Sequence, residues 1–271
     1  KIINEELTVD DSLFLYHDVC TNGIGYVDLM FKTDSIAPEQ IPYLGLLKSV
    51  LGYVDTENYS YGELFNEINA NTGGINCGGE VFDRADSTEE FQAMFSVRGK
   101  ALYTKMDFLF KMIGEILNSS KLEDTKRLYE IVASVKSRAQ VNLTGAGHST
   151  AVLRAADSSP MAAFQDEMAG IGYYQFIEKL EKDFEQRKEE TVEELCKLMK
   201  KILRPENFMI SYTGERESLE TVQKLAGAVK AGLGTEPVEK SEEKLTCTKK
   251  NEGFKTSGQV QYVAQTGNFK K

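Results

Sequence analysis

The stretch that decides the fold is "GLLKSVLGYVDTENYSYGELFNEINANTGGI", residues 45 to 75. It predicts two helices separated by a short turn. The second helix follows Ser60, which forms a capping box with Glu63, and it ends at the glycine pair 73–74. The first helix runs over about residues 39–54, where apolar side chains recur at helical spacing: Ile41, Leu44, Leu47, Leu51 and Val54. The stretch contains no histidine.

Short apolar segments on both sides of this stretch predict strands. They lie at 12–19, 24–33, 74–83, 89–99 and 207–214. Thr-Asn-Gly at 21–23 is a turn signal, so the first two strands are expected to form a hairpin. Further helices are predicted at 103–117, 121–143, 147–157, 160–170, 171–183, 188–203 and 217–232. This order favours an α+β fold, in which an antiparallel sheet carries helices packed on one face.

The chain divides by composition into three parts. Residues 1–234 are expected to form one module that includes the helical region. Residues 235–257 are highly charged and sparsely apolar, which is typical of a linker. Residues 258–271, "GQVQYVAQTGNFKK", read as the first strand of a following module. The chain has no initiator Met and stops soon after that strand begins, so we expect it to be a piece of a longer protein.

The charge and the cysteine spacing limit the class of protein. With 42 acidic and 32 basic residues the net charge is -10, and no basic face is available for nucleic acid. No apolar run is long enough for a membrane span, and the first ten residues have no signal-peptide core. The cysteines are widely spaced and are expected to be free thiols: Cys20, Cys77, Cys196 and Cys247. These features predict a cytoplasmic protein that binds neither nucleic acid nor membrane.

Residues suited to catalysis form no recognisable constellation. The histidines, His17 and His148, are too far apart to bind a metal together from one helix face. No G-x-S-x-G nucleophile elbow and no phosphate-binding loop is present. Several carboxylates near the deciding stretch are of common surface types, and no two of them define a catalytic pair: Glu63, Glu67, Asp83 and Asp86.

Aromatic residues at the start of the helix predicted at 171–183 allow two interpretations. Tyr173, Tyr174 and Phe176 could line a cleft that holds a peptide, but such a helix face more often belongs to the core. No substrate-binding residue follows from the pattern. By their chemistry alone, the residues predict a scaffold or binding domain.

The run "PYLGLLKSVLGYVDTENYSYGELFNEINANTGGINCGGEVF", residues 42–82, resembles the pitrilysin-like zinc metallopeptidases of the presequence protease and falcilysin branch. In that family the first helix carries an inverted zinc motif, H-x-x-E-H, whose histidines bind zinc and whose Glu activates water. The resemblance places Leu46, Ser49 and Val50 at the motif positions, and none of them can bind zinc or act as the base. A later helix supplies the third ligand, and the corresponding helix at 121–143 has Glu123 and Glu130.

The resemblance implies a role without catalysis. Such proteases contain four similar modules, of which only the first carries the zinc motif, and this chain resembles the third. The resemblance implies that the protease degrades unfolded peptides inside a closed chamber, and that this chain forms part of the chamber wall. Its partner is then the catalytic N-terminal half of the same polypeptide, which holds the zinc, while this segment has no catalytic or metal residue. An alternative is an inactive scaffold subunit of a multiprotein assembly.

Overall fold

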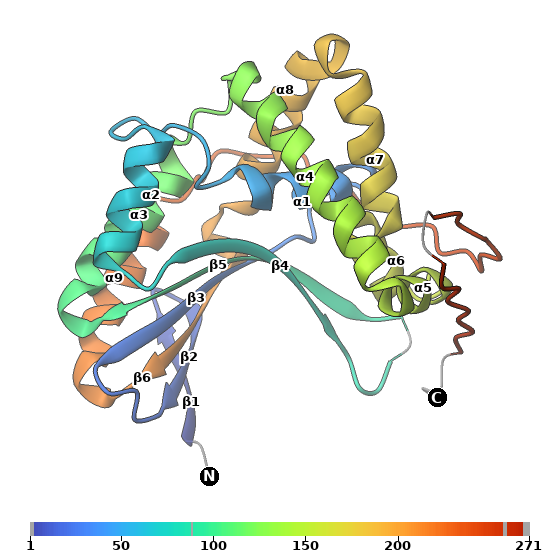
Figure 1. Cartoon of the computed structure of the whole chain (residues 1–271). Coiled ribbons are helices and arrows are strands. Elements are labelled where there is room, and N and C mark those ends of the chain that lie inside the picture. Colours follow the sequence, from blue (N-terminus) through green and yellow to red (C-terminus); the bar gives the residue numbers. More distant parts are fainter. Residues whose placement is uncertain (1–2, 88, 257–258, 268–271) are drawn as a thin grey trace.

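A six-stranded sheet forms the centre of the molecule, in the order β1-β2-β6-β3-β5-β4. The computed structural model describes residues 3–87, 89–256 and 259–267. The helices cover the convex face of the curved sheet and leave its concave face open (Figure 1). The strands are β1 (Ile3–Val9), β2 (Ser12–Asp18), β3 (Ile24–Lys32), β4 (Ile75–Asp83), β5 (Phe91–Leu102) and β6 (Phe208–Gly214).

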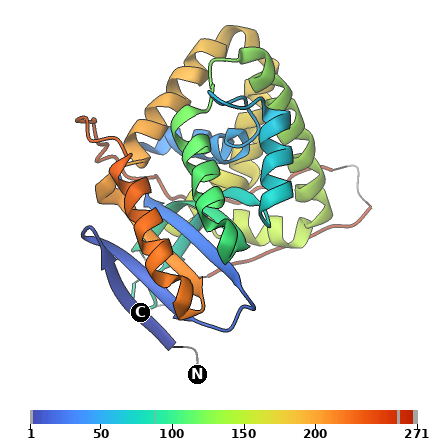
Figure 2. The same cartoon turned by 90° about the vertical axis from the view of Figure 1, so that its left-hand side faces the viewer.

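Long helices make up most of the middle of the chain. Their bounds are α1 (Ile41–Val50), α2 (Tyr61–Asn71), α3 (Met106–Ser119), α4 (Thr125–Gly145), α5 (Gly147–Ala155), α6 (Pro160–Ala169), α7 (Ile171–Lys182), α8 (Phe184–Ile202) and α9 (Leu219–Ala231). Helix α3 packs between α2 and α9 (Figure 2). The predicted fold class, an α+β module with helices on one face of the sheet, is confirmed.

The predicted hairpin is wrong, although both of its strands are present. Strand β6 lies between β2 and β3, so these two do not pair with each other. Strand β6 runs antiparallel to β3 and parallel to β2. The sheet is therefore mixed rather than wholly antiparallel. The true hairpin joins β2 to the unpredicted edge strand β1 through Asp10 and Asp11, both at positive φ. The Thr-Asn-Gly turn instead wraps the carboxylate of Glu215, which accepts from the backbone N–H groups of residues 21–23.

Helix α1 packs through its predicted apolar face. Leu44, Leu47 and Leu51 are 1%, 1% and 2% exposed, which confirms that they belong to the core. The helix is shorter than predicted, because Leu51 is already extended and Gly52 has φ 85°. Ser60 caps α2 as expected, with its side chain accepting from the Glu63 backbone N–H.

The C-terminal segment has no regular secondary structure in the described residues from 235 onward. It is nevertheless attached to the module: Glu252 binds Arg154, and Lys250 pairs with Asp157. The strand predicted at 258–271 is not formed by residues 259–267, and residues 258 and 268–271 lie outside the described part. The division into module, linker and following module stays a prediction. Within the described residues, no helix is long and apolar enough to cross a membrane.

Candidate functional site

Helix α1 lies in close contact with α6 and α7 because residue 45 is glycine. A Cβ atom there would approach the Met168 carbonyl oxygen to 2.3 Å and the Tyr173 ring to 2.7 Å. No real Cβ tolerates such distances, so Gly45 is what permits the Tyr173 ring to lie on the helix. The start of the deciding stretch is therefore shaped for a close packing of helices.

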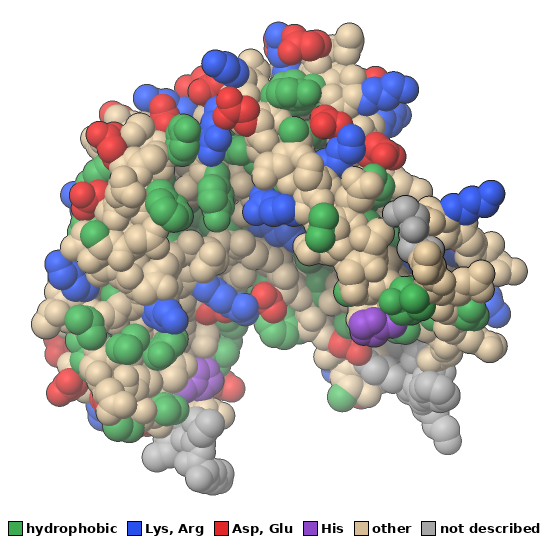
Figure 3. All heavy atoms as spheres, in the orientation of Figure 1, with side chains coloured by type: hydrophobic (Ala, Val, Ile, Leu, Met, Phe, Trp, Pro, Cys, Tyr) green, Lys and Arg blue, Asp and Glu red, His purple; other side chains and the backbone are tan. Residues whose placement is uncertain are grey.

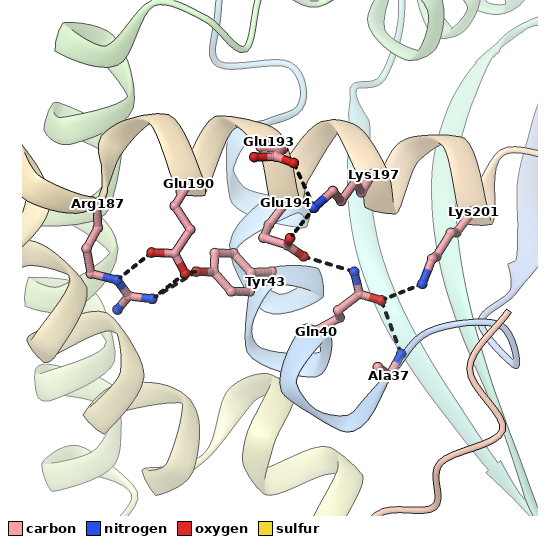
Figure 4. Close-up of polar contacts among 9 residues, drawn as sticks. All are labelled: Ala37, Gln40, Tyr43, Arg187, Glu190, Glu193, Glu194, Lys197 and Lys201. Carbon is pink, nitrogen blue, oxygen red and sulfur yellow. Dashed lines mark hydrogen bonds and ion pairs between the residues drawn. The ribbon is translucent and has the colours of Figure 1, made fainter. Parts of the chain in front are cut away.

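The N-terminal end of α1 is fixed to α8 by polar contacts (Figure 4). The Gln40 side chain donates to Glu194 at 3.0 Å and accepts from Lys201 at 3.1 Å. One turn further on, the Tyr43 hydroxyl accepts from Arg187 at 3.0 Å. These contacts are part-buried, so they restrict both the position and the rotation of α1.

The three positions on α1 that the resemblance assigns to the motif differ in burial. Leu46 and Val50 are fully buried in the hydrophobic core, at 0% exposure. Ser49 is half-buried, and its hydroxyl donates weakly to the Gly45 carbonyl oxygen at 3.5 Å. Leu46 and Val50 point into the core. A metal-binding side chain at position 49 would therefore have no second ligand beside it on α1.

The carboxylates considered for the third position do not complete a site. Glu123 precedes α4, and Glu130 is exposed and paired with Arg127 at 2.9 Å. Neither lines the cavity beside Ser49. Among the described residues, no group of three or more His, Cys, Asp or Glu side chains could hold a metal ion. The residues present do not fit the zinc that the resemblance assigns to the active module.

A cavity of about 390 Å³ opens beside Ser49, between α1, α4, α5 and α7. Its size is in the range of small-molecule sites. Its lining combines two cations, Lys48 and Arg138, with four hydroxyl-bearing residues and with apolar side chains; the residues used below are Lys48, Ser49, Val135, Arg138, Leu143, Leu153 and Tyr173. None of the described lining residues is Asp or Glu.

The Lys48 ammonium extends over the Tyr173 ring, 5.8 Å from its centroid. Burial lowers the pKa of Lys48, and the nearby Glu80 carboxylate acts in the opposite direction. That carboxylate already pairs with Arg98 at 3.1 Å. Arg138 is exposed at the mouth of the cavity. Neither cation forms an ion pair within the described part of the chain.

Tyr173 is 5% exposed, and its buried hydroxyl has no hydrogen-bond partner among the described residues. Burial raises the pKa of Tyr173, while the nearby Ser49 hydroxyl and Arg138 act to lower it. The Ser49 hydroxyl is close to that of Tyr173 but does not meet hydrogen-bond geometry, and Ser49, Arg138 and Tyr173 all line the cavity. The core interpretation of the aromatic cluster holds for Tyr173 and Phe176, the latter edge-on to Tyr43 at 4.8 Å. Tyr174 instead donates to Glu178.

A second hollow lies on the open face of the sheet, with a volume of about 320 Å³. It is lined by β3, β5 and β6 residues such as Tyr26, Asp28, Arg98 and Thr213. Arg98 donates to Asp28 at 2.7 Å and pairs with Glu80, so its charge is matched. Figure 3 shows the molecule deeply hollowed beneath the arch of the sheet. The sequence predicted these strands but not the depth of the hollow.

The remaining candidates lie apart from both hollows or serve local structure. His17 is hydrogen-bonded to Asn4 and Ser211, at 2.8 and 3.2 Å. The His148 ring lies 6.2 Å from that of Tyr262. Glu63 caps its own helix, and Asp86 pairs with Arg84. Glu67 accepts from an asparagine on its own helix, and Asp83 lies at the end of β4. The four cysteines are free.

The mixed sheet covered by helices, with no metal-binding group among the described residues, agrees with a non-catalytic module of the pitrilysin class. The family of segments associated with the peptidases of family M16, subfamily C, matches residues 1–180. The chain belongs to this family, which confirms the predicted resemblance to the presequence protease branch of the pitrilysin-like peptidases.

Relatives and solved structures agree with this assignment. The chain is 35% identical to "Protein HypA" of Clostridium perfringens over 271 residues, all of this chain and 28% of that protein. It is 27% identical to "Presequence protease 1, chloroplastic/mitochondrial" of Arabidopsis thaliana, over 94% of this chain and 24% of that one. The chain thus spans about a quarter of both relatives. A solved "peptidase M16 inactive domain" from Pseudomonas fluorescens has the same fold, with TM-score 0.57 and 14% identity, covering 92% of this chain and 54% of that one.

Proposed function

We propose that this chain is the non-catalytic segment of a zinc metallopeptidase that degrades unfolded peptides in a closed chamber. The observation that carries the proposal is the state of α1. Hydrolysis needs a zinc held by fixed ligands and a carboxylate that takes a proton from water. At the motif positions the helix offers two core side chains, Leu46 and Val50, and the hydroxyl of Ser49. The fold of the active module is retained and its chemistry is replaced by packing.

The proposed partner is the catalytic N-terminal half of the same polypeptide, which would hold the zinc. This proposal is supported by the share of the relatives that the chain spans, about a quarter of their length. The segment itself would need no cofactor. A cytoplasmic location stays a prediction, and relatives named as mitochondrial or chloroplastic give it no support.

The open face of the sheet is the surface that suits a chamber wall. It is concave and polar, and it presents Arg98, Asp28 and Lys100 beside the exposed Tyr26 ring. Its charges are partly matched, whereas the chain as a whole carries -10. The net negative charge of the whole chain, rather than of this face, would concentrate basic unfolded peptides, and salt would weaken this preference. Binding of a basic peptide that ignores both salt and peptide charge would contradict the electrostatic part of the proposal.

The test of the proposed function compares the full-length protein with this chain. We expect an H-x-x-E-H helix in the polypeptide upstream of Lys1, and peptidase activity of the full-length protein that a chelator abolishes. The chain alone should cleave no peptide. Full-length protein without such a helix and without activity would instead support the scaffold subunit. Chelator-sensitive activity of this chain alone would contradict both.

A further inference from the structure

The geometry points to a carboxylate-binding site in the cavity between α1, α4, α5 and α7, suited to a ligand that joins one carboxylate to a short aliphatic group. Its cations are Lys48 and Arg138, and its lining includes Tyr173, whose buried hydroxyl has no hydrogen-bond partner among the described residues. The inference does not depend on the peptide chamber, because it rests on the charge, burial and shape of this cavity alone.

The first argument is charge. In a chain with more acidic than basic residues, none of the residues that line the cavity is Asp or Glu, although α7 carries Glu178 and Glu181 outside the lining. Helices α1 and α5 contain no Asp or Glu, and α4 contains none after Glu130. Half-buried Lys48 and exposed Arg138 lack ion-pair partners in the described structure, whereas two arginines near them in the fold, Arg127 and Arg187, are paired. The unpaired, half-buried Lys48 ammonium is costly, and a bound anion would reduce that cost.

The second argument is the unpartnered hydroxyl. Buried polar groups in native proteins almost always have hydrogen-bond partners, so an orphaned one needs an explanation. The Tyr173 hydroxyl lies near Ser49 and Arg138, and all three residues line the cavity. The hydroxyl is buried in this structure, so a ligand would reach it only after a small shift of the side chains around it. A tyrosine hydroxyl can donate to a carboxylate oxygen while a guanidinium binds the same group in its planar fork.

The third argument is the apolar part of the cavity lining. Val135, Leu143 and Leu153 also line the cavity, and they offer contacts to a few carbon atoms. The helix N-terminus beside the cavity is not a competing anion site, since Asp166 already accepts from the Ile171 and Gly172 backbone N–H groups at 2.9 and 3.0 Å. The combination fits an aliphatic carboxylate better than inorganic phosphate. Such a carboxylate has two sources, the C-terminus of a peptide ending in an apolar residue and a free short-chain acid.

The test is a titration of the 15N-labelled chain followed by NMR. N-acetyl-leucine represents the peptide C-terminus, hexanoate represents the free acid, N-acetyl-leucinamide lacks the charge, and inorganic phosphate lacks the aliphatic group. We expect the first two to shift cavity resonances with saturation, and the other two to bind at least tenfold more weakly. Tighter binding of N-acetyl-leucine assigns the peptide source, and tighter binding of hexanoate assigns the free acid. Equal binding of the amide or of phosphate would overturn the proposal.

Variants locate the site. Arg138→Met and Lys48→Met should each raise the Kd at least tenfold, and Tyr173→Phe at least threefold. The matched control is Lys126→Met, which removes an exposed charge from the same helix outside the cavity lining and should change the Kd less than twofold. The Arg138 side chain is exposed, so its replacement is expected to leave the fold intact, as the amide spectrum will report. Unchanged affinity of Arg138→Met with an intact spectrum would overturn the assignment.

Discussion

Two regions of the helical layer hold an arginine, Arg154 on α5 and Arg138 on α4, and their electrostatics differ. Arg154 on α5 is 8% exposed and bonds to both Asp166 and Glu252, at 2.5 and 2.6 Å. Burial disfavours its charged form, but the two carboxylates outweigh burial and raise the pKa of Arg154. Arg138 on α4, with Lys48 opposite, has no carboxylate partner in the described chain. A matched buried charge indicates structure, whereas unmatched charges around an orphaned hydroxyl indicate a site kept for a ligand.

The largest effect on stability is expected at Arg154, whose charge is matched by Asp166 and Glu252. Arg154→Met should destabilise the chain by about 4 kcal/mol, because removal of one partner leaves Asp166 buried with an uncompensated charge. Urea unfolding measures the change. The control is Arg84→Met in an exposed ion pair, with an expected change within about 0.5 kcal/mol. A loss below about 1 kcal/mol for Arg154→Met would mean that the cluster is not a structural fastening.

The motif positions give the next largest effect. Leu46→Ala should cost about 3 kcal/mol, since a fully buried leucine is replaced by a cavity. Ser49→Ala, at the neighbouring motif position, should change stability by less than about 1 kcal/mol because its hydroxyl makes only one long hydrogen bond. Equal costs at the two positions, measured by chemical unfolding, would contradict the division of α1 into a core face and a cavity face.

Replacement of Tyr173 is expected to raise the stability of the chain rather than lower it. Tyr173→Phe should stabilise the ligand-free chain by about 1 kcal/mol, because it removes a buried hydroxyl that has no partner among the described residues. Thermal unfolding in the absence of small carboxylates measures this. Tyr43→Phe serves as the control, since the Tyr43 hydroxyl accepts from Arg187 and its loss should destabilise. A destabilised Tyr173→Phe would show that the hydroxyl is satisfied and would remove one argument for the site.

The smallest effect concerns pH. Burial acts to raise the pKa of Glu115, but hydrogen bonds from Thr56 and Asn58 outweigh burial and lower it to about 2. The folded pKa lies below the ordinary value of 4.5, so this stabilisation is present above pH 4.5 and is lost as the pH falls toward 2. The group is only partly buried, so the effect should stay below about 1 kcal/mol. Glu115→Gln should be less stable than the unaltered chain above about pH 4.5 and should lose this disadvantage as the pH falls toward 2, as urea unfolding at several pH values will show.

How much the sequence predicts depends on whether a feature is local. The capping box at Ser60 and the apolar face of α1 follow from neighbouring residues, and both are confirmed. The hairpin failed because β6, almost 200 residues later, inserts between β2 and β3. Strand β1 was missed because "INEELTV" has few apolar residues, as suits an edge strand.

Only part of the candidate site could be predicted from the sequence. Leu46, Ser49 and Val50 could be placed from the resemblance, but the cavity requires Arg138, Leu153 and Tyr173 to meet Ser49 from three other helices. The hydrophobic periodicity of a single helix does not predict which residues of other helices it will contact. One sign was present in the sequence, namely the absence of acids from α1, from α5 and from the second half of α4 in an acidic chain.

The central claim, that this module keeps the fold of a zinc peptidase without its metal, is tested most directly by elemental analysis of the purified chain. We expect no stoichiometric zinc, and a melting temperature that is unchanged by a chelator, because the core at Leu46 and Val50 replaces the ligands. One zinc per chain, lost together with the folded structure on chelation, would contradict the account.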